Sequence, residues 1–270
     1  MVVPPDRQRL LAAVERSPQA AAAHDRAGWV GLFATDGRIE DPVGSRPHVG
    51  HRQIGRFYDT FIGPRDITFH RDLDVVVGTV VVRDLELEVC MGSAVTMHIP
   101  AFLRYDLQQD LREGNGQWRI ARLRAYWELP AMMLQFLGTG SRAIRPAVQL
   151  SRGLLTNQGL RGTAGFGAGF RRVGARHQKF VEAFLGAVTR GDTTTAGRAL
   201  SPTATITLGD DQPLGLAGLA ERLEGGGWTK TIGAGSTVTV AVNSGRGRAV
   251  LFAEVARRAD AIDGIGYFPA

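Results

Sequence analysis

The sequence predicts an α+β fold in which helices pack on one face of a curved antiparallel sheet and leave a cone-shaped pocket. Helical patterns come first, then a short strand and one more helix, and a long run of β-branched strands follows. The same order of patterns begins again after residue 175, which indicates a diverged tandem repeat. We therefore expect two copies of one fold in this chain.

Composition limits the possible functions. The 270 residues are enough for two domains, and no apolar run approaches the ~20 residues of a membrane helix. The N-terminus becomes polar too early for a signal peptide, and one cysteine allows no internal disulfide, so we expect a cytoplasmic protein without a membrane partner. The formal charge of +6 comes from scattered arginines, and Cys/His clusters with metal-ligand spacing are missing. We expect no nucleic-acid partner, no metal and no organic cofactor.

The first domain is expected over residues 1–132. Residues 6–34 predict two helices that are interrupted at Pro18, because proline removes a helical hydrogen bond. A short strand at 38–40 precedes a loop rich in proline and glycine, and residues 51–62 predict another helix. From residue 66 the β-branched runs predict strands, with a break at Gly78 and turn residues in the loop at 108–116.

The remainder of the chain divides into a linker and a second copy. Residues 133–175 are rich in glycine and arginine and predict a connecting segment. Residues 176–270 predict a helix, a short strand, a second helix and a hairpin. After residues 265–267 the chain has little length left, so we expect the second copy to lack some strands of the first.

Alternation along the strands of the first domain predicts one nearly pure apolar face, because successive side chains point to opposite sides of a sheet. Helices must cover this face, and a pocket between them would be apolar. The residues expected to bind a ligand there are Phe33, Phe57, Leu85, Leu87, Met97, Ile99, Ala101, Leu123, Ala125 and Trp127.

Asp41 is the candidate catalytic residue, at the end of the short strand that enters this unit. If its carboxyl group points into the apolar cone, desolvation raises its pKa, as a general base requires. The alternative is that Asp41 only begins the Asp-Pro turn, a position that aspartate favours. Tyr58 is likewise either a functional phenol or an aromatic residue of the core.

Three segments, LFATDGRIEDPVG, HVGHRQIGRFYDTF and RAYW, resemble the ketosteroid isomerase and SnoaL-like superfamily, whose fold is also named after nuclear transport factor 2. The resemblance covers residues from about 20 to 130. It implies that Asp41 is the base that moves a proton between two carbons of an enone precursor. It also implies that Tyr58 belongs to the hydrogen-bond network behind the oxyanion site and that Trp127 is a wall of the pocket.

The sequence departs from that family on the electrophilic side. The oxyanion aspartate of the family falls on Ala101, its oxyanion tyrosine falls on Ser17, and a second network tyrosine falls on Phe33. Losing one oxyanion donor typically lowers the rate by about 10²–10³-fold. Either Tyr58 or a donor that the sequence does not place then polarises the substrate, or the chemistry is different, or there is none.

The second copy differs at both catalytic positions, since Leu208 aligns with Asp41 and Leu223 with Tyr58. We therefore expect the second domain to be non-catalytic, and to pair with the first as an intramolecular pseudo-dimer unless two chains form a homodimer. The resemblance implies a steroid delta-isomerase-like or polyketide cyclase-like enzyme that acts on an apolar small molecule. The alternatives are a non-catalytic binding or scaffold protein, and a hydratase or epoxide hydrolase in which Asp41 activates water.

Overall fold

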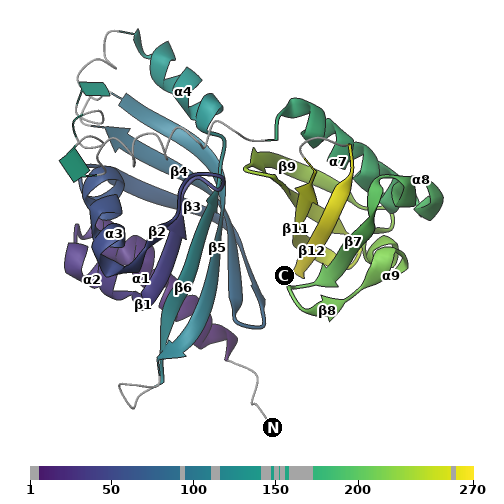
Figure 1. The fold of residues 1–270 in the computed structure, drawn as a ribbon, viewed down its shortest axis with the longest axis horizontal. Helices are drawn as coiled ribbons and strands as arrows, with labels where there is room; N and C mark the ends of the chain where they lie inside the picture. Colours follow the sequence, from purple (N-terminus) through teal and green to yellow (C-terminus); the bar gives the residue numbers. More distant parts are fainter. Residues whose placement is uncertain are drawn as a thin grey trace. The chain divides into compact units, whose positions relative to one another are not determined.

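The computed structural model describes residues 6–91, 95–110, 116–140, 173–256 and 260–270, with the short pieces 147–148, 152 and 156–157. The chain divides into two compact units, one built from Met1–Asp74 and Thr79–Phe170 and the other containing Arg171–Ala270. Each unit has helices beside a six-stranded sheet (Figure 1). The predicted α+β fold and its repetition in tandem are confirmed.

The first unit begins with helices and continues into long strands. Its elements are α1 (Arg7–Ala22), α2 (Arg26–Gly31), β1 (Phe33–Glu40), β2 (His48–Val49), α3 (Gly50–Phe57), the π-helical turn η1 (Tyr58–Ile62), β3 (Asp66–Val77), β4 (Val80–Met91), β5 (Val95–Asp110), β6 (Gln117–Tyr126) and α4 (Leu129–Gly138). The sheet order is β2-β1-β6-β5-β4-β3, and β1 lies parallel to β6. Both strands therefore end at the same edge of the sheet.

The predicted interruption at Pro18 is wrong, because α1 continues through this residue to Ala22. The buried stripe of α1, which includes Leu10 and Val14, packs against the core. This packing outweighs the ~3 kcal/mol that an internal proline costs a helix. The chain turns instead at His24, whose φ is 51°, and at Asp25, which caps α2 by accepting a 2.8 Å hydrogen bond from the Gly28 N–H.

The second unit repeats this order with shorter strands. Its elements are α7 (Ala175–Thr189), α8 (Thr193–Arg198), β7 (Leu200–Leu208), β8 (Gln212–Pro213), α9 (Gly215–Leu223), β9 (Gly227–Ala234), β10 (Thr237–Ser244), β11 (Gly247–Val255) and β12 (Ile262–Pro269). The sheet order is β8-β7-β12-β11-β10-β9, and β7 lies parallel to β12.

The expectation that the second copy lacks strands is therefore wrong. β9, β10, β11 and β12 have 8, 8, 9 and 8 residues, whereas the matching strands of the first unit have 12, 12, 16 and 10. Shorter strands fit the whole sheet into the shorter chain. The segment GWTKTIGA forms β9, a strand that the sequence pattern does not predict.

The repeat extends to the local conformations between the helices. Gly191 has a φ of 73° at the position that His24 occupies in the first unit. The next residue, Asp192, caps α8 by accepting a 3.0 Å hydrogen bond from the Thr195 N–H, as Asp25 caps α2. The same turn and the same cap thus join the first two helices of both units.

The two units differ in how the space between helices and sheet is filled. In the second unit a continuous cluster of buried side chains, including Val181, Leu219 and Leu251, occupies it, and Leu208 packs against this cluster. In the first unit the same space contains a cavity, which is described below. Helix α4 follows β6 and reaches Gly138, beyond residue 132, and most of the expected linker lies outside the described residues.

Membrane-spanning helices and clusters of metal-binding side chains are both missing from the described residues. These residues contain no helix that is both long enough and apolar enough to cross a bilayer. In the same residues, no three His, Cys, Asp or Glu side chains lie together as metal ligands would.

Candidate active site

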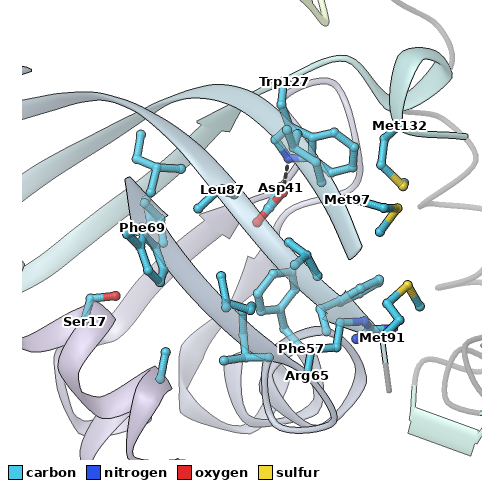
Figure 2. A pocket seen from close by; sticks show the side chains of 18 of the residues that line it. Ser17, Asp41, Phe57, Arg65, Phe69, Leu87, Met91, Met97, Trp127 and Met132 are labelled. Carbon is cyan, nitrogen blue, oxygen red and sulfur yellow. Dashed lines mark hydrogen bonds between the residues drawn. The ribbon is translucent and has the colours of Figure 1, made fainter. Parts of the chain in front are cut away.

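Asp41 lies at the edge of the first sheet where two parallel neighbours end. It follows Glu40, the last residue of β1, and Trp127 follows Tyr126, the last residue of β6. The Val43 N–H donates a 2.8 Å hydrogen bond to the Ala125 carbonyl oxygen and ties the loop after Asp41 to β6. As a result the indole Nε1–H of Trp127 donates a 2.6 Å hydrogen bond to Oδ1 of Asp41 (Figure 2).

The carboxyl group of Asp41 faces a cavity of about 350 Å³ inside the first unit. This volume lies within the roughly 300–1,000 Å³ that is usual for small-molecule sites. The walls come from the helices α1, α2, α3 and α4, the turn η1 and the strands β3, β4, β5 and β6, and they are mostly apolar. Six of the ten residues predicted to bind a ligand are in these walls, namely Phe57, Leu87, Met97, Ile99, Leu123 and Trp127.

The environment of Asp41 changes its proton affinity. Burial raises the pKa of this carboxyl group from 3.8 to about 6, and the hydrogen bond from Trp127 opposes the rise. Asp41 retains some accessible surface, which we assign to the cavity that it lines. A carboxylate with this pKa is ionised at neutral pH and holds a proton more firmly than an exposed aspartate does.

The other four predicted ligand-binding residues do not line the cavity. Phe33, Leu85, Ala101 and Ala125 are each at most 1% exposed and belong to the packed core around it. Leu85 and Ala101 are directly opposite each other on β4 and β5, and the next pair toward the cavity, Leu87 and Ile99, forms the wall. Alternation predicted the correct face of these strands but not how far along them the cavity extends.

Tyr58 is also outside the cavity wall. It begins the π-helical turn, and its ring packs against Trp29 at a centroid distance of 5.5 Å. Its buried hydroxyl group has no hydrogen-bond partner among the described residues, so the network implied by the family resemblance is not formed there. Trp29, which the sequence analysis did not select, lines the cavity in its place.

Two hydroxyl groups that the sequence analysis did not select as ligands belong to wall residues. Ser17 on α1 and Tyr105 on β5 line the cavity, and they are hydrogen-bonded to each other. Burial raises the pKa of Tyr105 to about 12, so this phenol keeps its proton at neutral pH. Tyr105 has the same strand parity as Met97 and Ile99, and extending the alternation past Leu103 would have identified it.

A buried ion network holds the strands around Tyr105. Arg83 on β4 is only 1% exposed and donates hydrogen bonds to Oδ1 of Asp74 at 2.7 Å and to Oε2 of Glu15 at 2.9 Å. These contacts join β4 to β3 and to α1, the helix that carries Ser17. Because removing one partner of a buried ion pair is strongly destabilising, this network fixes the geometry of that part of the wall.

Helix α4 forms a wall that the sequence analysis partly assigned to the linker. Met132, Met133 and Phe136 line the cavity, together with Met91 and Met97 from the strands (Figure 2). Every methionine of the chain except Met1 is therefore a wall residue. The apolar run AMMLQFL directly after the last strand was the signal for this helix. Methionine side chains adapt easily to different ligand shapes.

Comparison with known proteins identifies the fold of the first unit. The Nuclear transport factor 2 (NTF2) domain family matches residues 10–134. A Mycobacterium tuberculosis protein in complex with estradiol-17beta-hemisuccinate is 26% identical, with a TM-score of 0.40 over 45% of this chain and 95% of that chain. The Delta 5-3-ketosteroid isomerase from Mycobacterium sp. is also 26% identical, with a TM-score of 0.40 over 46% of this chain and 96% of that chain. An LEH-like epoxide hydrolase from Mycobacterium tuberculosis is 17% identical, with a TM-score of 0.41 over 55% of this chain and 98% of that chain.

The family match and the strand order lead to one conclusion. The matched residues 10–134 contain the helices, the whole sheet and most of α4 of the first unit. The second unit has the same strand order with the same parallel pair. Residues 10–134 form a nuclear transport factor 2-like domain, and the chain carries two units of this fold in tandem.

Proposed function

We propose that the first unit is an enzyme that transfers a proton next to the carbonyl group of an apolar small molecule, as steroid delta-isomerases and polyketide cyclases do. The observation that carries the proposal is Asp41, the sole carboxylate among the described wall residues of the cavity. Its pKa of about 6 lies close to neutral pH, where a general base combines ionisation with useful proton affinity.

In the proposed reaction Asp41 does the proton transfer. The ionised carboxylate accepts a proton from a carbon adjacent to the substrate carbonyl, and the neutral acid returns it to another carbon of the same conjugated system. Trp127 orients the carboxyl group through its Nε1–H and limits the rise of the Asp41 pKa. The apolar walls hold the hydrocarbon body of the substrate and exclude water from the reacting carbons.

The reaction also needs a donor for the carbonyl oxygen, on which negative charge develops. Tyr58 is outside the wall, so we propose Tyr105, with Ser17 as its hydrogen-bond partner. If Ser17 donates to the Tyr105 oxygen, the phenolic hydrogen is free to bind the substrate. A neutral phenol in a dry site is a strong donor to a developing oxyanion.

Binding without turnover is the second candidate function. Ala101 stands at the position of the family's oxyanion aspartate, and the cavity is mostly apolar with adaptable methionine walls. A ligand carrier needs these features but no general base. Water activation by Asp41, as in a hydratase or epoxide hydrolase, has less support, because the described wall offers no second carboxyl group as an acid.

The test is the conjugation of a 5-ene-3-ketosteroid, followed by absorbance, in the wild type and in Asp41→Asn. We expect the substitution to lower the rate by about 10²–10⁴-fold, the usual contribution of a general base. Asp36→Asn is the matched control, because Asp36 lies on β1, the strand that Asp41 follows, and is exposed. Equal rates for the wild type and Asp41→Asn would refute the proposal.

Ligand binding separates the two candidate functions. Titration with an equilenin-like phenolic steroid measures occupation of the cavity without turnover. Tight binding by a wild type that does not convert the ketosteroid would favour the carrier. We also predict that the two units pair as a pseudo-dimer or that two chains form a homodimer. The molar mass in solution tests the homodimer.

A further inference from the structure

Arg65 brings a positive charge into the otherwise mostly apolar wall of the cavity. It follows the turn η1 and precedes β3, and its side chain is half-buried among the wall residues. In Figure 2 it lies on the side of the cavity that carries Met91, whereas Asp41 lies beside Trp127. The proton transfer proposed above does not require Arg65.

Part of the Arg65 side chain is buried in the cavity wall. This burial lowers the pKa of Arg65 from 12.5 to about 10. An arginine that only covers apolar surface with its hydrocarbon stem keeps its charged head in water. At neutral pH Arg65 is therefore a charged group that has lost part of its hydration.

The described part of the chain does not neutralise this charge. Within it, Arg65 forms no ion pair, and its nearest acidic neighbours in sequence are already engaged. Asp59 receives two hydrogen bonds from Arg26, and Asp66 contacts His24 at 3.1 Å. The arginine-rich segment at residues 141–172 contains no acidic residue. A partly dehydrated cation without a counter-ion is costly unless a ligand supplies one.

The hydrogen bonds of Arg65 leave one edge of its guanidinium group available to a ligand. Its Nη1 donates to the Thr60 carbonyl oxygen at 2.6 Å, which fixes the position of the group. Among the described residues, Nε and Nη2 have no acceptor in the protein. This edge of a guanidinium group binds a carboxylate through two parallel hydrogen bonds.

Arg65 and Asp41 act on different parts of a ligand. Figure 2 shows Asp41 beside Trp127 and Arg65 on the side of Met91. A ligand that contacts both side chains spans the part of the cavity between them.

We propose that the ligand of this cavity is an apolar acid, whose carboxylate or similar anionic oxygen group binds Arg65 while its hydrocarbon body extends toward Asp41. This inference concerns the substrate class of the site proposed above and rests on that proposal for the role of Asp41. Its binding part requires no turnover.

The experiment compares two probes that differ in one charge, 3-oxo-4-androstene-17β-carboxylic acid and its methyl ester. Their affinities are measured by calorimetry for the wild type, Arg65→Gln and Arg56→Gln. Arg56 is exposed on α3 outside the wall, so Arg56→Gln removes the same net charge from the protein. We expect the wild type and Arg56→Gln to prefer the acid by roughly tenfold or more, and Arg65→Gln to bind both probes equally.

Several outcomes would overturn the inference. These are equal affinities in the wild type, no binding of either probe, a preference that survives Arg65→Gln, or a preference that Arg56→Gln removes as well. The ratio of the wild-type affinities for the acid and the ester tests the inference even if a variant does not fold. Arg65→Lys keeps the positive charge but cannot form two parallel hydrogen bonds, so we expect it to prefer the acid less strongly than the wild type does. If the preference is found but Asp41→Asn leaves the isomerisation rate unchanged, the proposed reaction fails while the anion site remains.

Discussion

The two units of this chain have the same strand order and the same cap on their second helix, but they differ where the first strand ends. In both units a parallel pair, β1 with β6 and β7 with β12, places the end of the first strand at one edge of the sheet. In the first unit this position holds Asp41, which faces the cavity. In the second it holds Leu208, which packs against a filled apolar cluster. The comparison shows that the fold supplies the position, and the side chains around it decide whether chemistry is possible there.

Differences in strand length contribute to the contrast between the interiors of the two units. The strands β3 to β5 of the first unit have 12 to 16 residues, and Met132, Met133 and Phe136 of α4 line the cavity beside them. The strands of the second unit have 8 or 9 residues, and α7 and α9 cover them with residues such as Val181 and Leu219. A short sheet under two helices leaves less space to fill than a long one.

The largest expected effect comes from giving the first unit the residue of the second. Asp41→Leu removes the general base, and we expect proton transfer to fall by about 10²–10⁴-fold while a neutral steroid still binds. The measurement is the initial rate of ketosteroid conjugation together with a binding titration. A variant that keeps its rate would show that the contrast at this position has no catalytic meaning.

Truncation of a leucine distinguishes a filled interior from a hollow one. Leu251→Ala in the second unit, where the side chain is 0% exposed, is expected to lower the free energy of unfolding by about 2–5 kcal/mol. Leu87→Ala in the first unit borders existing empty space and should lower it by only about 1 kcal/mol. Urea unfolding followed by tryptophan fluorescence measures both, with Trp228 reporting on the second unit. Equal losses would contradict the hollow first unit.

The burial of Asp41 also predicts how stability depends on pH. The unfolded chain releases this proton near pH 3.8 and the folded chain near pH 6, so the folded state binds more protons between these values and stability falls as the pH rises. Asp41→Asn removes that penalty. Relative to its value near pH 3.5, the stability difference between variant and wild type should grow by about 2–3 kcal/mol at pH 7.5.

Urea titrations over this pH range measure the difference, and Asp36→Asn should show no such growth. Leu208→Asn does not serve as a control, because it would place a polar group against the core of the second unit. A difference that is constant with pH would mean that Asp41 is hydrated in the folded protein.

The smallest expected effect comes from removing the hydrogen bond to Asp41. Trp127→Phe keeps most of the wall but loses the Nε1–H donor, which lowers the Asp41 pKa in the wild type. The pKa should therefore rise above about 6, by roughly one unit or less. The measurement is the pH dependence of kcat/KM, whose acidic limb should move to higher pH. A shift in the opposite direction would mean that the indole does not stabilise the carboxylate.

Much of the fold was readable in the sequence because its signals are local. Alternation identified the apolar face of β4, β5 and β6, and Gly78 marked the turn between β3 and β4. The features that the sequence did not predict depend on tertiary packing or have weak local patterns. Pro18 does not end α1 because packing of the helix outweighs the local cost, and β9 was overlooked because GWTKTIGA has little strand patterning of its own.

The site was readable in part for the same reason. Asp41, Leu87 and Trp127 follow from the strand pattern and from the family resemblance, and the structure brings them together around one cavity. Tyr58 and Ala101 have the right positions in the sequence but are packed outside that cavity. Tyr105 lies on β5 beyond the last residue to which the alternation was applied. Arg65 was missed because no short motif marks a cation that lines a cavity formed by distant elements.

The sequence by itself determined the α+β class, the tandem repeat and the strand end at which a carboxylate stands in one copy and a leucine in the other. These properties depend on periodicity and on residue type, which a chain displays without folding. Only the tertiary structure decided that a cavity lies beside Asp41 in the first unit, that Leu208 packs against an apolar cluster in the second, and that Asp41 has a pKa of about 6. Cavities and desolvation depend on the distances between side chains from many elements, and those distances exist only after the sheet and helices have packed.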